Sequence, residues 1–305
     1  MNRIQNVVFL GSKPLGLQVL DAIHRLRPEA LLSVVTFDDS ADDRSALDGF
    51  KTFAEATGKT VSIAKDASDA ERIIRSLQPD LVLVVCWYWL LKDALLSAIP
   101  HGAIGIHNSL LPNYRGGSPL VWAILNGEKE IGYSVFSLAS EMDAGQIWLQ
   151  ERIELPADAN VGHALELIRA SLLATLESSW CALLDGELKP RPQSEDGVSY
   201  CAQRMPVDGR IDWSRSAKQV ADFIRAQSPP YPGAFSVYDG KHLVIPAAAI
   251  WHSTYYGVPG QVCRVGSDHV LVVCGDNRAL VLTTVIVDGT ERPARQVLSS
   301  IKIRL

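Results

Sequence analysis

The sequence lacks the features that mark secreted, metal-stapled or membrane-spanning proteins. Its 305 residues include five cysteines, and no two of them are close enough in sequence for zinc-ribbon spacing. An odd, sparse set of cysteines is typical of reduced thiols in the cytosol. The longest apolar runs are too short for a membrane span, and the amino terminus lacks the pattern of a signal peptide. We therefore expect a cytoplasmic protein with no membrane association.

Positive charge is also scarce. Lysine and arginine total 29 against 34 acidic residues, and the net charge is −5. This balance argues against electrostatic binding of nucleic acid by the protein surface as a whole. Hydrophobic residues make up 47% and charged residues 21% of the chain, which excludes a disordered or fibrous protein. The length suggests one large or two ordinary domains, and it is enough to bury a sizeable core without disulfides or metals.

Short apolar runs alternate with helical patterns in the first part of the chain. The runs are typical of strands buried on both faces, and this order predicts a doubly wound, Rossmann-like, mostly parallel α/β sheet. Ligands of such a sheet bind beyond the carboxyl ends of its strands. A long amphipathic helix is expected at 161–184. We expect the strands at residues 7–10, 31–37, 61–63, 81–85, 104–107 and 133–138.

The composition changes towards the carboxyl terminus. Residues 189–204 are rich in proline and charged residues, which favours a linker. In residues 205–305, short runs of β-forming residues recur between glycine and aspartate, which predicts a small OB-like β-barrel domain. The first domain would then span residues 1–188. The sequence leaves open whether the chain forms a homodimer through the carboxyl-terminal domain.

A histidine and an aspartate each follow an expected strand. His107 ends one strand, and Asp143 comes shortly after the next. If both strands end at the same edge of a parallel sheet, the carboxylate can orient the imidazole, and the two side chains form a general acid–base pair. Spacing alone also permits purely structural roles for both residues. The seven histidines show no metal-ligand spacing, so we expect no metal.

A glycine loop follows the first strand but lacks the dinucleotide fingerprint. It reads Gly11-Ser12-Lys13-Pro14-Leu15-Gly16, without the Gly-x-Gly-x-x-Gly spacing. Either this loop is only a tight turn, or Ser12 and Lys13 contact an anionic substrate group at the start of the next helix. The missing fingerprint argues against a nicotinamide-dependent dehydrogenase.

One stretch of the chain resembles the signature of folate-dependent formyltransferases. It reads His107-Asn108-Ser109-Leu110-Leu111-Pro112, followed by Tyr114-Arg115-Gly116 and by Asp143-Ala144-Gly145. The spacing from His107 to Asp143 also agrees with that signature. Ile211-Asp212-Trp213 and Tyr231-Pro232-Gly233 are similar to the family's carboxyl-terminal domain. The likeness therefore covers nearly the whole chain, and it is closer to amino-sugar N-formyltransferases than to methionyl-tRNA formyltransferases.

The resemblance implies transfer of a formyl group from 10-formyltetrahydrofolate to an amine, with His107 and Asp143 as the catalytic pair. The family's oxyanion-stabilising asparagine, two residues before the histidine, is replaced by Gly105. Asn108 is a candidate for that role. The residues that the resemblance assigns to folate binding are Trp89, Leu90, Leu91, Ser109, Leu110, Leu111, Pro112, Ala139, Ser140, Glu141, Met142 and Asp143.

Local charge guides the prediction of the acceptor. Relatives that act on tRNA carry a basic insertion after the second strand, whereas residues 38–43 hold four aspartates and no basic residue. This favours a small amine, foremost a nucleotide-linked amino sugar, over nucleic acid. We expect Ser12, Lys13, Tyr114 and Arg115 to bind it. The weakly basic tail favours the alternative, a methionyl-tRNA formyltransferase. A formyl-folate hydrolase and a non-catalytic folate- or nucleotide-binding protein also remain open.

Overall fold

The structure, a computed structural model, describes residues 3–305. The chain divides into two compact units. Unit 1 contains the chain up to Gly116 together with Gly132–Ile153 and Glu166–Tyr200. Unit 2 contains Gly117–Ile131, Glu154–Leu165 and Cys201–Leu305. Two segments that precede residue 188 thus pack with the carboxyl-terminal part of the chain.

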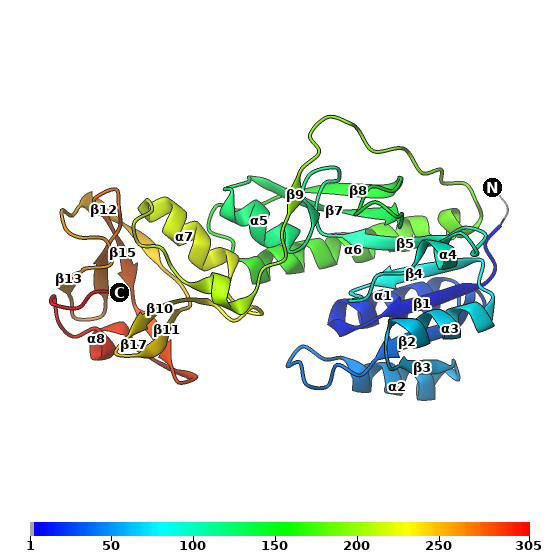
Figure 1. Cartoon of the computed structure of the whole chain (residues 1–305), viewed down its shortest axis with the longest axis horizontal. Helices are drawn as coiled ribbons and strands as arrows, with labels where there is room; N and C mark the ends of the chain where they lie inside the picture. Colours follow the sequence, from blue (N-terminus) through cyan, green and yellow to red (C-terminus); the bar gives the residue numbers. More distant parts are fainter. Residues whose placement is uncertain (1–2) are drawn as a thin grey trace. The chain divides into compact units, whose positions relative to one another are not determined.

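Unit 1 is built on a seven-stranded mixed sheet with the order β3-β2-β1-β4-β5-β7-β8 (Figure 1). The first five strands along the chain pair in parallel. The predicted Rossmann-like, mostly parallel sheet is therefore confirmed. Its strands are β1 (Val7–Gly11), β2 (Leu31–Phe37), β3 (Val61–Ala64), β4 (Leu81–Val85), β5 (Ala103–His107), β7 (Glu130–Ser137) and β8 (Ile147–Glu154).

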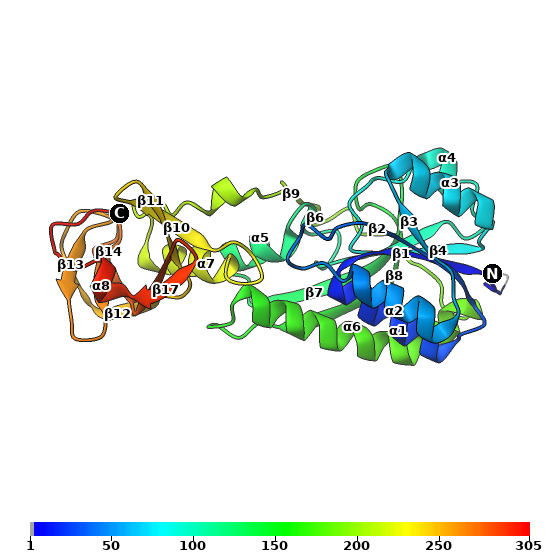
Figure 2. The same ribbon diagram turned by 90° about the horizontal axis from the view of Figure 1, so that it is seen from below.

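Helices cover both faces of this sheet. In Figure 2, α1, α2 and α6 lie on one face, and α3 and α4 lie on the other. Every residue of β1 and of β4 is buried, because these central strands are covered on both sides. The helices are α1 (Lys13–Leu26), α2 (Leu47–Thr57), α3 (Ala67–Leu77), α4 (Asp93–Leu96) and α6 (Val161–Leu184).

Helix α6 is the one helix in the described part of the chain that is long and apolar enough to cross a membrane, by length and composition alone. One stripe of the helix is nevertheless buried within the protein, including Ile168, Leu172 and Trp180. The hydroxyl of Tyr133 in β7 also donates a hydrogen bond to Thr175 of α6, at 2.7 Å. We therefore interpret α6 as a core helix that covers the sheet.

The direction of β7 differs from the expected one. β5 and β7 pair antiparallel, with His107 opposite Ser134 and Ile104 opposite Ser137. The interpretation that His107 and Asp143 follow strands ending at the same edge of a parallel sheet is therefore wrong. The end of β7 lies beside the start of β5, and the loop 138–146 carries the chain back to His107.

Unit 2 is mainly antiparallel, as predicted for the carboxyl-terminal domain. Its strands form two four-stranded sheets, β10-β11-β16-β17 and β12-β15-β14-β13, around one buried apolar core. The strands are β10 (Ala234–Tyr238), β11 (Lys241–Ile245), β12 (Ala249–Thr254), β13 (Val262–Val265), β14 (Val270–Val273), β15 (Arg278–Leu282), β16 (Thr284–Val287) and β17 (Thr290–Pro293). The helices are α5 (Pro119–Leu125), the 3₁₀ turn η1 (Pro206–Gly209), α7 (Ala217–Ala226) and α8 (Ala294–Val297).

Candidate active site

The structure brings the two predicted catalytic residues together. β5 ends at His107, and Asp143 comes from the loop 138–146. The Nδ1 atom of His107 lies 3.6 Å from Oδ2 of Asp143. The two side chains are 9% and 22% exposed, respectively. A largely buried imidazole therefore faces a carboxylate that retains some access to solvent.

The second ring nitrogen of His107 has a partner as well. Nε2 lies 2.7 Å from the carbonyl oxygen of Tyr114. Since a carbonyl oxygen can only accept, Nε2 carries a hydrogen and donates it. The backbone N–H of Gly116 donates to Oδ2 of Asp143 at 2.7 Å. Residues 114–116 thus contact both members of the pair, and a substrate atom reaches Nε2 only when the Tyr114 carbonyl releases it.

The loop 138–146 needs special backbone geometry to present Asp143. Asp143 has a φ of +48°, in the left-handed region that aspartate tolerates better than most residues. At Gly145 a Cβ atom would lie 1.8 Å from the carbonyl oxygen of Ser137, so only glycine fits there. The Asp-Ala-Gly sequence is therefore required by the turn as well as by the chemistry.

Position 105, where the family has an asparagine, is closely packed. A Cβ atom at Gly105 would lie 3.0 Å from Cδ2 of Leu138 and 3.5 Å from Cε1 of Phe136. Apolar side chains therefore line the space in which the asparagine side chain would begin. Asn108 is half-buried directly after His107. Its role in stabilising an oxyanion stays a prediction.

Arg115 is buried in a polar network beside the pair. Its side chain is 7% exposed, and it donates to Oε1 of Gln193 from Nε at 3.2 Å and from Nη2 at 2.8 Å. Its Nη1 lies 3.3 Å from Glu141 and 3.2 Å from the hydroxyl of Tyr200. The predicted contact of Arg115 with substrate would thus have to coexist with these internal partners. Tyr114, also a predicted substrate contact, is half-buried and has a φ of +58°.

Leu138 lies between two apolar clusters near the residues predicted to bind folate. Trp89, Leu91 and Leu138 all pack against one buried cluster of the sheet, and Leu138 also packs against the cluster that includes Leu111. Leu90 is 91% exposed. Of the remaining predicted residues, Ser109 is buried, Leu110 and Pro112 are half-buried, and Ala139, Ser140, Glu141 and Met142 are exposed.

Aromatic rings gather where β2 and β4 end. The Phe37 ring contacts Trp87, Tyr88 and Trp89 at centroid distances of 5.2, 5.5 and 5.1 Å. The indole nitrogen of Trp87 is buried without a hydrogen-bond partner. A buried N–H donor of this kind normally finds an acceptor. This end of the sheet therefore offers flat apolar surface and one unused donor.

Lys13 pairs with the acidic segment, residues 38–43, instead of facing solvent. Its side chain is 10% exposed, and its Nζ lies 2.6 Å from Asp39 and 2.8 Å from Asp42. Burial alone would lower the pKa of Lys13, but the two carboxylates outweigh it and raise the pKa above its usual value. Ser12 donates from Oγ to the carbonyl oxygen of Cys86 at 2.5 Å. Phosphate binding by Ser12 and Lys13 therefore stays a prediction.

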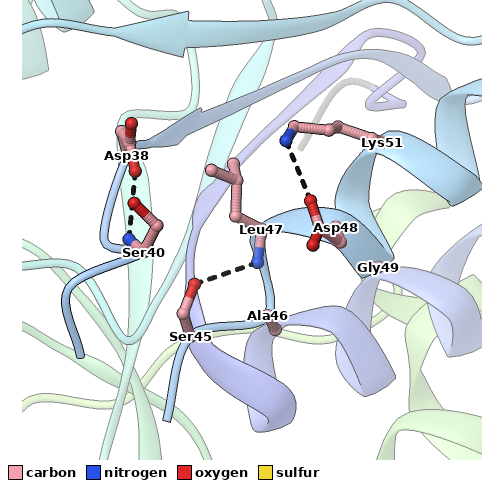
Figure 3. Close-up of a pocket in the computed structure, with 8 residues that line it drawn as sticks. All are labelled: Asp38, Ser40, Ser45, Ala46, Leu47, Asp48, Gly49 and Lys51. Carbon is pink, nitrogen blue, oxygen red and sulfur yellow. Dashed lines mark hydrogen bonds and ion pairs between the residues drawn. The ribbon is translucent and has the colours of Figure 1, made fainter. Parts of the chain in front are cut away.

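A polar cavity of about 300 Å³ lies beside the acidic segment (Figure 3). Figure 3 shows two carboxylates in its wall, Asp38 and Asp48, and one ammonium, Lys51. Each already has a partner, because the Ser40 N–H donates to Asp38 and Lys51 pairs with Asp48 at 2.8 Å. Because two carboxylates line the wall and Lys51 is paired with one of them, the cavity does not favour an anionic ligand.

Across residues 3–305, no three His, Cys, Asp or Glu side chains gather as a metal site would require.

Gln193 and Tyr200, which contact Arg115, lie in the segment interpreted as a linker. Its composition gave no signal for such a role.

Comparison with known proteins places this chain among enzymes that transfer formyl groups. Residues 5–169 match the family described as "Formyl transferase", and residues 205–301 match "Formyl transferase, C-terminal domain". The chain belongs to the formyl transferase family. It is 31% identical over 301 residues to the methionyl-tRNA formyltransferase of Anaeromyxobacter dehalogenans (strain 2CP-1 / ATCC BAA-258), covering 96% of this chain and 95% of the relative.

Solved structures share the fold at lower sequence identity. WlaRD, a sugar 3N-formyl transferase, superimposes with a TM-score of 0.69 at 14% identity, over 92% of this chain and 98% of that one. HypX from Aquifex aeolicus gives 0.67 at 19% identity, over 98% of this chain. The chain spans about half the length of HypX, 47%. The protein is thus a formyltransferase. The WlaRD structure was determined in the presence of 5-N-formyl-THF, a formylated tetrahydrofolate.

Proposed function

We propose that the protein formylates the amine of a small acceptor, foremost a nucleotide-linked amino sugar, using 10-formyltetrahydrofolate in the cytoplasm. The observation that carries this proposal is the acidic segment after β2. Asp38 and Asp43 are exposed there, and the nearby Lys13 is committed to Asp39 and Asp42. A tRNA backbone is attracted by lysine and arginine that release its counterions. This edge of the sheet instead exposes carboxylates, which repel the phosphates of tRNA.

A second candidate is methionyl-tRNA formylation. It is favoured by sequence relatives that carry this name and match almost the full length of the chain, such as the one from Anaeromyxobacter dehalogenans. The sugar formyl transferase WlaRD is similar in fold alone. The sequence relatives and the local charge therefore point to different acceptors, and an experiment must decide between them.

His107 and Asp143 have clear roles in amine formylation. The neutral amine of the acceptor attacks the formyl carbon, and the carbon–nitrogen bond to the folate then breaks. We assign both proton steps to His107 Nε2: its hydrogen goes to the folate nitrogen as that nitrogen leaves, and the ring nitrogen then takes the proton that the amine loses. For this the Tyr114 carbonyl must release Nε2. Asp143 faces Nδ1 and fixes the orientation of the ring.

The aromatic end of β2 and β4 fits the folate. A flat pterin ring requires apolar walls and a few polar partners. Trp87 offers its unpartnered indole N–H, and the exposed side chain of Leu90, nearby in the sequence, offers apolar surface. We assign the oxyanion to Asn108 or to backbone N–H groups, because Gly105 has no side chain to donate.

One parallel assay separates the acceptors. The protein is incubated with 10-formyltetrahydrofolate and, separately, with nucleotide-linked amino sugars and with methionyl-tRNA at physiological salt, and mass spectrometry detects the added formyl group. We expect formylation of an amino sugar, with His107→Ala lowering the turnover by about two to four decades. Efficient formylation of the tRNA would establish the second candidate. Binding without turnover, or hydrolysis of the formyl donor alone, would refute transfer to either acceptor.

A further inference from the structure

The segment that follows α6 is hydrogen-bonded to the loops that hold the catalytic pair. We name residues 190–201 the strap. Within it, β9 (Tyr200–Cys201) pairs with β6 (Arg115–Gly116) in a two-stranded sheet. Ser199 accepts the Tyr114 N–H on its Oγ at 2.9 Å and the Arg115 N–H on its carbonyl oxygen at 2.8 Å. The strap therefore supports the same residues 114–116 that contact His107 and Asp143.

One strap side chain reaches the Asp143 loop directly. The side-chain amide of Gln193 donates from Nε2 to the carbonyl oxygen of Asp143 at 2.6 Å and to that of Gly145 at 2.8 Å. Its Oε1 accepts from Arg115. The Gln193 amide thus links the loop that carries Asp143 to Arg115, with its nitrogen as donor to one and its oxygen as acceptor from the other. A neutral amide is suited to this position, because one end must donate and the other must accept.

The Asp143 turn depends on such support. Asp143 is in a left-handed conformation that an aspartate occupies only when its surroundings favour it. Gln193 bridges the carbonyl groups on either side of Ala144 and so closes the turn. The carboxylate is 3.6 Å from His107 Nδ1, slightly beyond ordinary hydrogen-bond length. Small displacements of the turn therefore change how well the ring is oriented.

We infer that Gln193 is a positioning residue of the reaction: it acts through the backbone of Asp143 and Gly145 to set the carboxylate against His107. This inference rests on the proposed roles of His107 and Asp143 in formyl transfer. It makes the strap a component of the active site, where the sequence alone indicated a linker.

Two variants test the inference against a matched control. Gln193→Ala removes the whole bridge. Gln193→Glu keeps an oxygen for Arg115 but has no hydrogen to donate to the two carbonyl groups when ionised. Gln5→Ala removes a glutamine side chain that is exposed and remote in sequence from the site. For each variant, steady-state kinetics are measured over pH with the acceptor that turns over in the parallel assay, and hydrogen exchange is followed in residues 138–146.

We expect Gln193→Ala and Gln193→Glu to lower kcat roughly 10- to 100-fold, as for a misplaced catalytic group. Little change is expected in KM for the formyl donor, and the pH profile should shift. Exchange in residues 138–146 should be faster in both variants and unchanged in Gln5→Ala. Unaltered exchange, or an unaltered kcat and pH profile while His107→Ala is inactive, would overturn the role of Gln193. Near-normal turnover in His107→Ala would instead overturn the proposed catalytic pair.

Discussion

Restoring the family's asparagine at position 105 should destabilise this protein. In Gly105→Asn, the new Cβ atom would lie 3.0 Å from Cδ2 of Leu138 and 3.5 Å from Cε1 of Phe136. The carboxamide would add three further heavy atoms to this packed space. Overpacking of this kind costs about 1–3 kcal/mol. For a chain of this size, that loss corresponds to a fall in Tm of about 2–10 °C.

The partner that must yield can be identified by a double-mutant cycle. Gly105→Asn, Leu138→Ala and the double variant are unfolded in urea and followed by circular dichroism. Because Leu138→Ala removes the closest contact, the double variant should be more stable than the sum of the two single changes by about 0.5–3 kcal/mol. Gly105→Ala is the control, since it adds the Cβ atom without the amide. Additive effects, or an asparagine variant as stable as the parent, would refute the packing argument.

Three further predictions concern stability and thiol chemistry. Arg44 and Lys13 hold the pKa of Asp42 below its usual value, so its contribution to stability is present above the unfolded pKa of about 4 and is lost as the pH falls. In Asp42→Asn, the free energy of unfolding should therefore fall less steeply than in the parent as the pH is lowered from 7. An equally steep fall in the variant would contradict this. Burial raises the pKa of Cys274 to about 12, and we expect its thiol to react with a thiol reagent at pH 8 only after unfolding. Rapid reaction of Cys274 in the native protein, detected by peptide mapping, would show otherwise. Trp180 on α6 is 2% exposed, so Trp180→Ala should lower the free energy of unfolding by about 3–5 kcal/mol. A decrease below about 1 kcal/mol in urea unfolding would disprove its place in the core.

The parallel strands were predictable because burial on both faces leaves a continuous apolar run. β4, with the sequence Leu-Val-Leu-Val-Val, is the clearest case. β8 was not predicted, since its second half reads Gln150-Glu151-Arg152 and is partly exposed at the edge of the sheet. The antiparallel turn from β5 to β7 was also beyond prediction. It depends on the path of an intervening segment that packs with unit 2.

The candidate site was predictable only in part. The residue types and spacing of His107 and Asp143 identified the pair through their resemblance to a family. The geometry that joins them is set by a loop with left-handed backbone, which no strand pattern predicts. Gln193 could not be found, because its role comes from two backbone carbonyl groups that any sequence would supply. Hydrophilic composition describes a flexible linker and a bonded strap equally well.

The division of the chain into discontinuous units bears on how such enzymes diversify. The chain leaves unit 1 after Gly116 and again after Ile153 before its final departure at Cys201. In unit 2, α5 from the first excursion packs against α7 from the carboxyl-terminal part. A genetic crossover at the strap would therefore combine α5 from one relative with α7 from another. Exchange of the carboxyl-terminal domain between relatives must replace three stretches together, so unit 2 should change more readily by local substitution than by recombination.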